Sequence, residues 1–545
     1  MYCDLKIASV YHWGTLTLKY YSSVSVQGDR IALCTPTPEL ENKMGEEEVL
    51  SEMRSTIQVQ KDGLKKIRTI DERLVSYNIE MTEVTGGTFW KAYTPEQIAG
   101  TEPFPAADNF SEMTKMMQEY PPVDLYEEKI RKFAKALGPV YIRVSGSWAT
   151  DTYYDFDGHT GGVVPKGYKS ILTKEQWDGV LDFVKEVDAK LLISVSNCKG
   201  DHKNGKPWTP EQAKVIFDYS KEYGVPILAA EFMNEPNVFP MNPPAENYGV
   251  EAFGQDQDTF FCFIRENYPE VKLVGPCSCA DTFDGEKCAA KSALQSVPTE
   301  ELLDHCKVRG DIFSYHCYAG LSDRGAAIGG HWDAEDALSE AYLNVAAKAA
   351  ENYGKIRDRY YPGAPMWVTE SADAGLGGNT WGSTYMDVIR YADELGRFAT
   401  ITDGIIFHNT LASSDYGLLD YTTHLPRPIY WLIFLWNRLV GTEVFDSAEE
   451  IREGSHIYAH SRKDGNPGYT YICINNSKTE KLTAVLPANA EMYLLDAETL
   501  RCGEIRINGM VPKLTSDGSM PELQPKTVKQ GNVEIPPASV AFLVI

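Results

Sequence analysis

The sequence predicts an α/β protein, a (β/α)8 TIM barrel with a second, smaller antiparallel β-sandwich domain. The chain has 545 residues, which exceeds one ordinary domain and suffices for two. From about residue 75, short β-branched runs alternate with amphipathic stretches, which is typical of βαβ units around a parallel sheet. After about residue 438, short alternating strands with turn signals take over, which indicates antiparallel β structure.

Eight strand-and-helix rounds can be counted in the first of these regions, and eight is the number that closes a (β/α)8 barrel. The helical patterns, such as 126–137, 173–189 and 335–354, carry apolar residues at three- and four-residue spacing. A doubly wound open sheet is the alternative, but no glycine-rich phosphate-binding turn follows any strand. The expected strands are 77–84, 140–148, 190–197, 227–235, 271–277, 312–318, 365–371 and 404–411.

The domain boundaries follow from these changes of pattern. We expect the catalytic barrel to span 75–437. The stretch 55–74 forms two predicted strands around an Asp-Gly turn, so we expect 51–74 to join 438–545 in the sandwich. Residues 1–50 form an N-terminal extension of unknown role.

Composition excludes several classes of partner. A net charge of −25 makes nucleic acid a poor ligand, because cationic side chains supply most of that affinity. No run approaches the eighteen apolar residues of a membrane span, so we expect no membrane partner. The eleven cysteines are odd in number and scattered, and Cys277, Cys279 and Cys288 lack the pairing of a zinc site. Reduced cysteines and a poor N-terminal signal predict a cytoplasmic location.

Two glutamates stand where a barrel places its active groups, at the carboxyl ends of strands. Glu235 ends the fourth predicted strand and Glu370 the seventh. Alone, each could be a surface or capping carboxylate. As a pair they suit glycoside hydrolysis, in which one carboxyl protonates the leaving oxygen and the other attacks the anomeric carbon. We expect Glu235 to be the acid/base, Glu370 the nucleophile, and the deeper Glu231 structural.

Neighbouring polar residues extend this hypothesis. The Asn234 amide could bind the sugar 2-hydroxyl, or serve only as a turn residue before Pro236. His316 and Tyr318, on the sixth strand, could orient Glu370, although a satisfied core histidine is the alternative for His316.

Several segments resemble glycoside hydrolase family 79, the family of heparanase and β-glucuronidases, a group of retaining enzymes with (β/α)8 barrels. The Asn-Glu-Pro and Thr-Glu-Ser sites are shared by a wider clan. The glycine-rich stretch after Glu370 and the two C-terminal segments are specific to the family. The resemblance rests on 78–87, 142–155, 231–237, 314–320, 368–378, 416–444 and 535–545.

The resemblance implies a substrate with a terminal glucuronic acid. It places Tyr416, together with the backbone amides of Gly377 and Gly378, at the sugar carboxylate, and backbone N–H groups can bind an anion without adding side-chain charge. The loop from 374 to 378 contains fewer glycines than that of heparanase, which leaves open which amides bind. Glu80 and Ser147 match positions that contact sugar hydroxyls, where heparanase has aspartate and threonine.

We therefore expect a retaining exo-β-glucuronidase that acts on small glucuronide conjugates or oligosaccharides and needs no cofactor or metal. The alternatives are an endo-acting heparanase-like enzyme, a glucosidase or xylosidase of the same clan, and an inactive carbohydrate-binding barrel. The chain's negative charge argues against the endo-acting enzyme, because sulfated glycosaminoglycans are polyanions. The sequence does not determine the oligomeric state.

Overall fold

The computed structural model describes residues 55–281, 296–516 and 518–545, together with four strands near the N-terminus. These four strands form two antiparallel pairs, β1 (Lys6–His12) with β2 (Thr15–Tyr21) and β3 (Ser23–Gln27) with β4 (Arg30–Cys34). The rest of the predicted N-terminal extension, and Cys288, lie outside the described residues.

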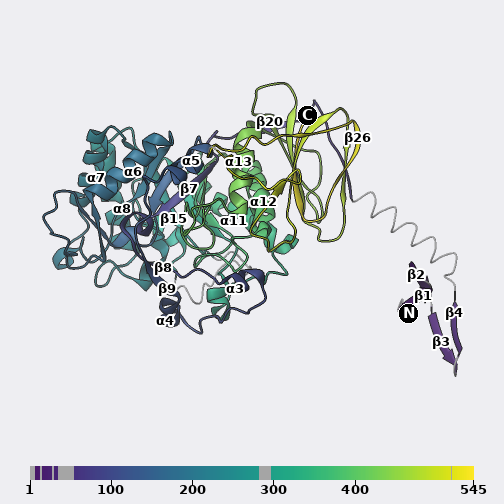
Figure 1. The fold of residues 1–545 in the computed structure, drawn as a ribbon. Helices are drawn as coiled ribbons and strands as arrows, with labels where there is room; N and C mark the ends of the chain where they lie inside the picture. The colour runs from purple at the N-terminus through teal and green to yellow at the C-terminus, as the bar shows by residue number, and fades with distance from the viewer. Residues whose placement is uncertain are drawn as a thin grey trace.

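Eight parallel strands close into a barrel, which confirms the predicted fold class and excludes the open sheet (Figure 1). Their order around the barrel follows the chain, with the eighth strand beside the first. The strands are β7 (Val75–Glu80), β10 (Tyr141–Ser145), β13 (Lys190–Ser194), β14 (Ile227–Glu231), β15 (Lys272–Ser278), β16 (Ile312–Tyr318), β17 (Met366–Ala372) and β18 (Ile406–His408).

Several barrel strands end earlier than the sequence predicts. The fourth stops at Glu231 rather than at residue 235, and the eighth is only three residues long. Phe232 and Met233, which follow β14, are still buried in the core. Apolar loop residues that pack like strand residues explain why hydrophobicity alone extends these strands too far.

Helices surround the barrel and bury one apolar face each against it. Capping residues start several of them, as at α6, where the Thr173 side chain accepts from the Gln176 amide. The pattern over 335–354 becomes a helix that begins at Glu340, after the N-cap Ser339. The long helices are α5 (Glu128–Ala136), α6 (Lys174–Glu186), α7 (Glu211–Tyr223), α8 (Val250–Asn267), α11 (Glu340–Tyr360), α12 (Tyr385–Ile401) and α13 (Pro428–Leu439).

Shorter elements fill the connections between barrel strands and helices. An antiparallel pair, β8 with β9, follows the first strand, and a parallel pair, β11 with β12, follows the second. These elements are α2 (Met81–Thr85), β8 (Gly87–Trp90), α3 (Pro95–Ala99), α4 (Phe110–Met113), η1 (Thr114–Met116), β9 (Met117–Tyr120), η2 (Ala149–Asp151), β11 (Thr152–Asp155), β12 (Ser170–Thr173), η3 (Lys203–Gly205), η4 (Pro236–Met241), α10 (Thr299–Asp304) and η5 (Asp323–Ile328).

The C-terminal residues form two further sheets. One has the order β24-β23-β27-β21-β20-β19-β6 with β25 beside β23, and the other has the order β26-β22-β5. Two strands from before the barrel thus take part, because β6 pairs with β19 and β5 with β22. The strands are β5 (Thr56–Gln58), β6 (Lys66–Thr69), β19 (Val440–Phe445), β20 (His456–Arg462), β21 (Tyr469–Asn475), β22 (Leu482–Leu486), β23 (Ala490–Asp496), β24 (Arg506–Ile507), β25 (Lys526–Val528), β26 (Gly531–Ile535) and β27 (Ser539–Val544).

Helix α12 joins the barrel to these sheets, which lie beside it in Figure 1. Asp393, on α12, bonds three side chains: its Oδ1 lies 2.5 Å from His456 Nδ1 and 2.6 Å from the Tyr458 hydroxyl, and its Oδ2 lies 2.6 Å from Arg397 Nε. His456 Nε2 lies 2.8 Å from Glu340 Oε1 on α11. A buried, fully bonded carboxylate therefore connects the two domains.

No helix in the described ranges combines the length and the apolarity needed to cross a bilayer.

The Asp393 cluster predicts a pH-dependent stability. Burial alone would lower the pKa of His456, but its ion pairs with Asp393 and Glu340 raise that pKa to about 9. A histidine pKa raised on folding stabilises the protein below about pH 6.5, and this contribution disappears as the pH rises through about 9. We expect Asp393→Asn to lower the free energy of unfolding by about 3 to 5 kcal/mol. The variant should also lose this decline in stability at alkaline pH, as measured by thermal or denaturant unfolding.

The exposed ion pair between Lys481 and Glu534, whose Nζ and Oε2 are 2.8 Å apart, gives the matched control. Glu534→Gln should cost less than about 1 kcal/mol. An Asp393→Asn protein as stable as the control, or one that keeps the alkaline decline, would contradict the assignment.

Candidate active site

A buried arginine organises the carboxyl end of the barrel. Arg143, on β10, is fully buried among acceptors from three other strands or their ends. Its Nε donates to Glu231 Oε2 at 2.9 Å, its Nη1 to Glu370 Oε2 at 3.2 Å and its Nη2 to Asn234 Oδ1 at 2.7 Å. Glu231 is therefore a structural partner of the arginine, as expected.

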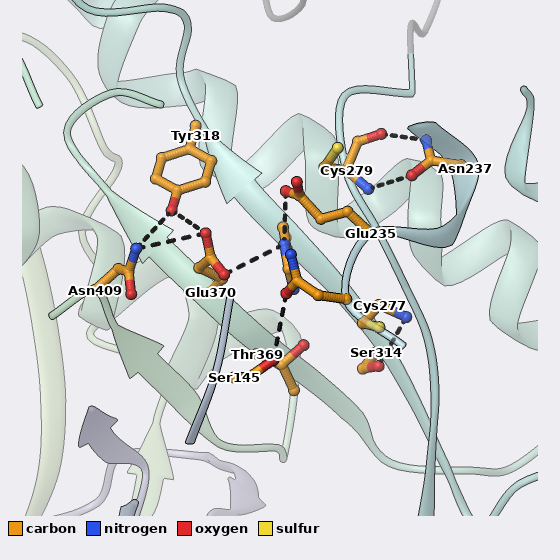
Figure 2. Close-up of polar contacts among 12 residues, drawn as sticks. Ser145, Glu235, Asn237, Cys277, Cys279, Ser314, Tyr318, Thr369, Glu370 and Asn409 are labelled. Carbon is orange, nitrogen blue, oxygen red and sulfur yellow. Dashed lines mark hydrogen bonds and ion pairs between the residues drawn. The ribbon is translucent and has the colours of Figure 1, made fainter. Parts of the chain in front are cut away.

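Glu370, on β17, is held from both of its carboxylate oxygens. While Oε2 accepts from Arg143, the Tyr318 hydroxyl donates to Oε1 at 2.5 Å, and Asn409 Nδ2 lies 3.4 Å from the same oxygen. Figure 2 shows the Tyr318 hydroxyl directed at both Asn409 and Glu370. These donors and the nearby guanidinium stabilise a negative charge on Glu370.

Glu235 lies just past β14 in a left-handed backbone conformation, with φ 46° and ψ 57°, immediately before η4. Its Oε1 lies 2.9 Å from His316 Nδ1, while His316 Nε2 lies 3.3 Å from Arg143 Nη2. Since an arginine can only donate, Nε2 accepts and Nδ1 carries the proton that Glu235 receives in a hydrogen bond. Burial lowers the pKa of His316 to about 4, so this imidazole is neutral near neutral pH.

The two glutamates therefore have different environments. Glu370 contacts a cation, whereas Glu235 contacts a neutral histidine, and burial raises the pKa of the Glu235 carboxyl. One carboxylate oxygen of each and a ring nitrogen of His316 lie within 4.8 Å of one another. A carboxyl with a raised pKa thus faces one that an arginine contacts, which is the arrangement for combined acid and nucleophilic chemistry.

Both glutamates line a cavity of about 600 Å³. Six more of the residues expected from the sequence line it as well. Gly377 and Gly378 do not, and at this loop the cavity is lined by Gly375 and Leu376 instead. The six are Glu80, Ser147, Asn234, His316, Tyr318 and Tyr416.

The glycine pair packs behind the cavity wall. Both residues have positive φ, 85° for Gly377 and 82° for Gly378, and a Cβ on Gly377 would lie 2.7 Å from the Trp90 ring. A Cβ on Gly378 would lie 3.2 Å from the Tyr416 backbone nitrogen. Close packing against Trp90 and Tyr416 thus requires glycine at both positions, and the expectation that their amides face the sugar stays a prediction.

Asn409, which follows β18, connects the remaining polar groups of the site. It was not among the residues predicted from the sequence. Its Nδ2 lies 3.1 Å from the Tyr416 hydroxyl, 3.2 Å from the Tyr318 hydroxyl and 3.3 Å from Glu80 Oε1. Burial and the nearby charges of Glu370 and Glu83 raise the pKa of Glu80 well above its usual range. The position of Asn409 at a strand end was the signal that could have identified it.

Cys279 is a second residue that sequence reasoning did not connect with the site. Its backbone nitrogen donates to Asn237 Oδ1 at 3.0 Å, and its carbonyl accepts from Asn237 Nδ2 at 2.5 Å. Figure 2 shows its side chain near the Glu235 carboxyl, whose pKa it lowers against the effect of burial. Asn237 thus holds Cys279 against the acid residue. Cys279 is one of eight cysteines within residues 55–281, 296–516 and 518–545, none of which forms a disulfide.

Two clusters have a spacing that could hold a metal ion. In the first, formed by Glu235, His316 and Glu370, the Arg143 guanidinium already occupies the Glu370 carboxylate and faces His316, so a second cation would be repelled. The second, formed by Asp155, Asp157 and His159, lies outside the cavity.

Comparisons with known proteins identify homologues across most of the chain, although no family model matches. Heparanase-like protein 1 of Arabidopsis thaliana is 24% identical over 78% of this chain and 85% of its own. Baicalin-beta-D-glucuronidase of Scutellaria baicalensis is 28% identical over 77% of this chain and 83% of its own. Inactive heparanase-2 of Homo sapiens is 23% identical over 69% of this chain, a match that covers 64% of that protein.

Among solved structures, a 4-O-alpha-L-rhamnosyl-beta-D-glucuronidase from Fusarium oxysporum 12S superposes with a TM-score of 0.59 at 11% identity. The match covers 90% of this chain and all of that one, and at this identity it supports the fold alone. Fold, site and homologues together define a glycoside hydrolase with a (β/α)8 barrel. Within that class, the resemblance to glycoside hydrolase family 79 is confirmed by the heparanase-like and β-glucuronidase homologues.

The Arg143 cluster predicts a large and pH-dependent loss of stability on substitution. Arg143→Met leaves the buried Glu231 and Glu370 without their cation, which should cost about 3 to 5 kcal/mol in unfolding experiments. Because the two carboxylates can take up protons in acid, this deficit should be smaller at about pH 5 than at about pH 8.

The same substitution at Arg359 is the control, because its ion pair with Glu300 is exposed, with Nη1 and Oε1 2.8 Å apart. Arg359→Met should change stability by less than about 1 kcal/mol at either pH. Equal losses in the two variants would mean that Arg143 is not the cation that compensates the site.

Proposed function

We propose that the protein is a retaining exo-β-glucuronidase that releases terminal β-D-glucuronic acid from small glucuronide conjugates by double displacement. The observation that carries this proposal is the Glu235 and Glu370 pair, which lies within 4.8 Å in one cavity. Retaining glycosidases have carboxyl groups about 5 to 5.5 Å apart, whereas inverting enzymes need roughly 6.5 Å or more to admit a water.

In the first step, Glu370 attacks the anomeric carbon while Glu235 gives its proton to the glycosidic oxygen, and the aglycone leaves. The raised pKa of Glu235 supplies the protonated acid, and the three donors around Glu370 keep its carboxylate oriented. In the second step, Glu235 removes a proton from a water molecule whose oxygen attacks the anomeric carbon. The bond between that carbon and Glu370 breaks, and the sugar leaves with its configuration retained.

The polar residues around this glutamate pair bind the sugar. We infer that Asn234 hydrogen-bonds the 2-hydroxyl, that Glu80 and Ser147 hydrogen-bond other hydroxyls, and that the Tyr416 hydroxyl hydrogen-bonds the carboxylate. Since Glu80 has a raised pKa, its neutral carboxyl can donate a hydrogen bond to a sugar oxygen. The Tyr416 hydroxyl already accepts from Asn409 and is free to donate its own proton to an anion.

The names of the relatives support a glucuronide substrate and differ on its size. One is a hyaluronoglucuronidase, one a baicalin-beta-D-glucuronidase and several are heparanases. Heparanase-2, which is described as inactive, shows that homology by itself does not guarantee activity. Hydrolysis of nitrophenyl β-glucuronide, but not of the glucoside or xyloside, would separate the proposal from the other clan members and from an inactive barrel.

The roles of the two glutamates predict different responses to leaving-group acidity. Glu370→Gln should lose nearly all turnover on every glucuronide. Glu235→Gln should lose little of the first step on a nitrophenyl glucuronide, which needs scant protonation, but most of it on an alkyl glucuronide. Steady-state and burst kinetics measure this, and equal losses on both substrates for Glu235→Gln would contradict the assignment.

Tyr416 should determine the preference for a uronate. A donor that is matched to a carboxylate is left unpaired over a hydroxymethyl group, at a cost of about 1 to 3 kcal/mol. Tyr416→Phe should therefore lower kcat/KM on a glucuronide about ten-fold or more and change the weak activity on a glucoside little. If both activities fell together, Tyr416 would be a general structural residue.

Cys279 should set the alkaline limit of activity, because its thiol lies near Glu235. The thiol lowers the pKa of this carboxyl, which burial raises, so its loss in Cys279→Val should raise the pKa of Glu235 further. The acid then keeps its proton to higher pH, and the alkaline limb of the pH–kcat profile should move upward. Cys279→Ser should restore the limb, and Cys473→Val, buried in the β-sandwich, should not move it.

A further inference from the structure

The cavity that holds the two glutamates has a polar part and an apolar part. Glu370 and its donor Tyr318 line the polar part with Glu80 and Tyr416, and these four are connected through Asn409. The rest of the lining includes apolar side chains that stay partly open to solvent. They are Met117, Trp148, Val238, Met241 and Leu376.

One wall of the apolar part is formed by the residues that come immediately after Glu235 in the chain. Glu235 is the N-cap of η4 (Pro236–Met241), which contributes Val238, Phe239 and Met241 to the cavity. Met241 is 43% exposed, so the fold gains little from an apolar side chain at this position. In glycoside hydrolysis the acid protonates the leaving oxygen, so the aglycone lies on the side of Glu235. The apolar wall is therefore on the leaving-group side.

The other wall comes from the β8 and β9 pair and the start of η2. Trp148 packs on Phe89, with ring centroids 5.0 Å apart and an interplanar angle of 60°. Phe89 is buried in a small cluster with Met113, against which Met117 and Trp148 pack. This cluster supports Trp148 from behind and leaves the side chain as part of the cavity lining.

Charge disfavours an anionic group on the aglycone, as distinct from the carboxylate of the sugar. Among its described lining residues, five are acidic, Glu80, Asp151, Glu235, Asp281 and Glu370, and the one lysine or arginine is Lys169. Lys169 is itself neutralised, because its Nζ lies 2.6 Å from Asp151 Oδ2. A sulfated or carboxylated aglycone would therefore meet no free cation on these walls and would be repelled.

We propose that the cavity beside η4 and Trp148 is an aglycone subsite for an uncharged apolar group, an alkyl chain or an aromatic ring, carried by glucuronic acid. This inference rests on the proposed glucuronidase function and names its substrate class. Specificity for the aglycone then comes from burial of apolar surface, whereas specificity for the sugar comes from hydrogen bonds.

Alkyl β-glucuronides from methyl to octyl test the subsite, because the acidity of the leaving alcohol hardly changes while its apolar area grows. We expect kcat/KM to rise about three- to four-fold for each methylene group that is buried, until the cavity is filled. Hydrolysis of all members at one rate would overturn the subsite and leave the glucuronidase function standing. Absence of hydrolysis of every glucuronide would overturn both.

Two variants with the same substitution test whether the preference for a longer alkyl chain arises at the wall formed by η4. Met241→Glu introduces a charge at an exposed position of the apolar wall and should lower the ratio of octyl to methyl kcat/KM at least ten-fold. Met510→Glu makes the same change at a position that is 75% exposed and far along the chain in the β-sandwich, and should leave the ratio unchanged. An unchanged ratio in Met241→Glu overturns the location of the subsite.

A glucuronyl disaccharide with a sulfated second sugar gives the opposing test. The acidic lining predicts that octyl glucuronide is the better substrate by kcat/KM, and that the disadvantage of the sulfated sugar shrinks as salt screens the charges. Preference for the sulfated disaccharide at low salt would overturn the proposed aglycone class and would favour the heparanase-like alternative.

Discussion

The buried guanidinium of Arg143 is the interaction on which the site depends. β14, β16 and β17 or their ends deliver acceptors to it, and without a cation the desolvated carboxylates of Glu231 and Glu370 would carry a penalty of several kcal/mol. The same guanidinium fixes the tautomer of His316, because it leaves Nε2 as an acceptor and directs the proton on Nδ1 toward Glu235. One arginine thereby gives the two glutamates different surroundings, a cation beside Glu370 and a neutral ring beside Glu235.

The barrel makes this arrangement possible through local departures from regular strands. Between β16 and β17 the register shifts after Tyr315, so that His316 pairs with Glu370. Glu235 adopts a left-handed conformation, which costs a residue with a side chain about 1 to 2 kcal/mol. The side-chain amide of Asn237 bonds the backbone N–H and carbonyl of Cys279 and so holds the turn that follows. Such local strain is typical of functional sites that surrounding contacts over-determine.

The cavity joins two kinds of recognition in one space. Hydrogen-bonding groups cluster around Glu370, and partly exposed apolar groups follow Glu235 on η4. Hydrogen-bond donors in fixed positions weaken the binding of a sugar that lacks the matching acceptor. An apolar wall discriminates between aglycones by the apolar surface area that they bury, and it tolerates many shapes. A strict choice of sugar combined with a broad choice of apolar aglycone is the expected consequence.

The sequence by itself determined the fold class and the positions of both glutamates. Eight β-branched runs alternating with amphipathic helices allow few topologies, and a carboxyl at a strand end needs only the barrel rule to be noticed. Local pattern also found three further cavity residues, Asn234, His316 and Tyr318, and the family resemblance pointed to Glu80, Ser147 and Tyr416. It could not find Arg143, which looks like an isolated charge in an apolar strand until three distant acceptors surround it.

Tertiary structure alone decided the contacts that tune the site. Asn409 and Glu80 are 329 residues apart in the chain, and Cys279 and Glu235 are on different strand ends, so no local periodicity connects them. Gly377 and Gly378, which the family resemblance assigned to anion binding, have a positive φ and close packing that only the tertiary structure shows. Side-chain direction at a barrel end depends on strand stagger and register shifts, and these are set by packing among all eight strands rather than by neighbours in sequence.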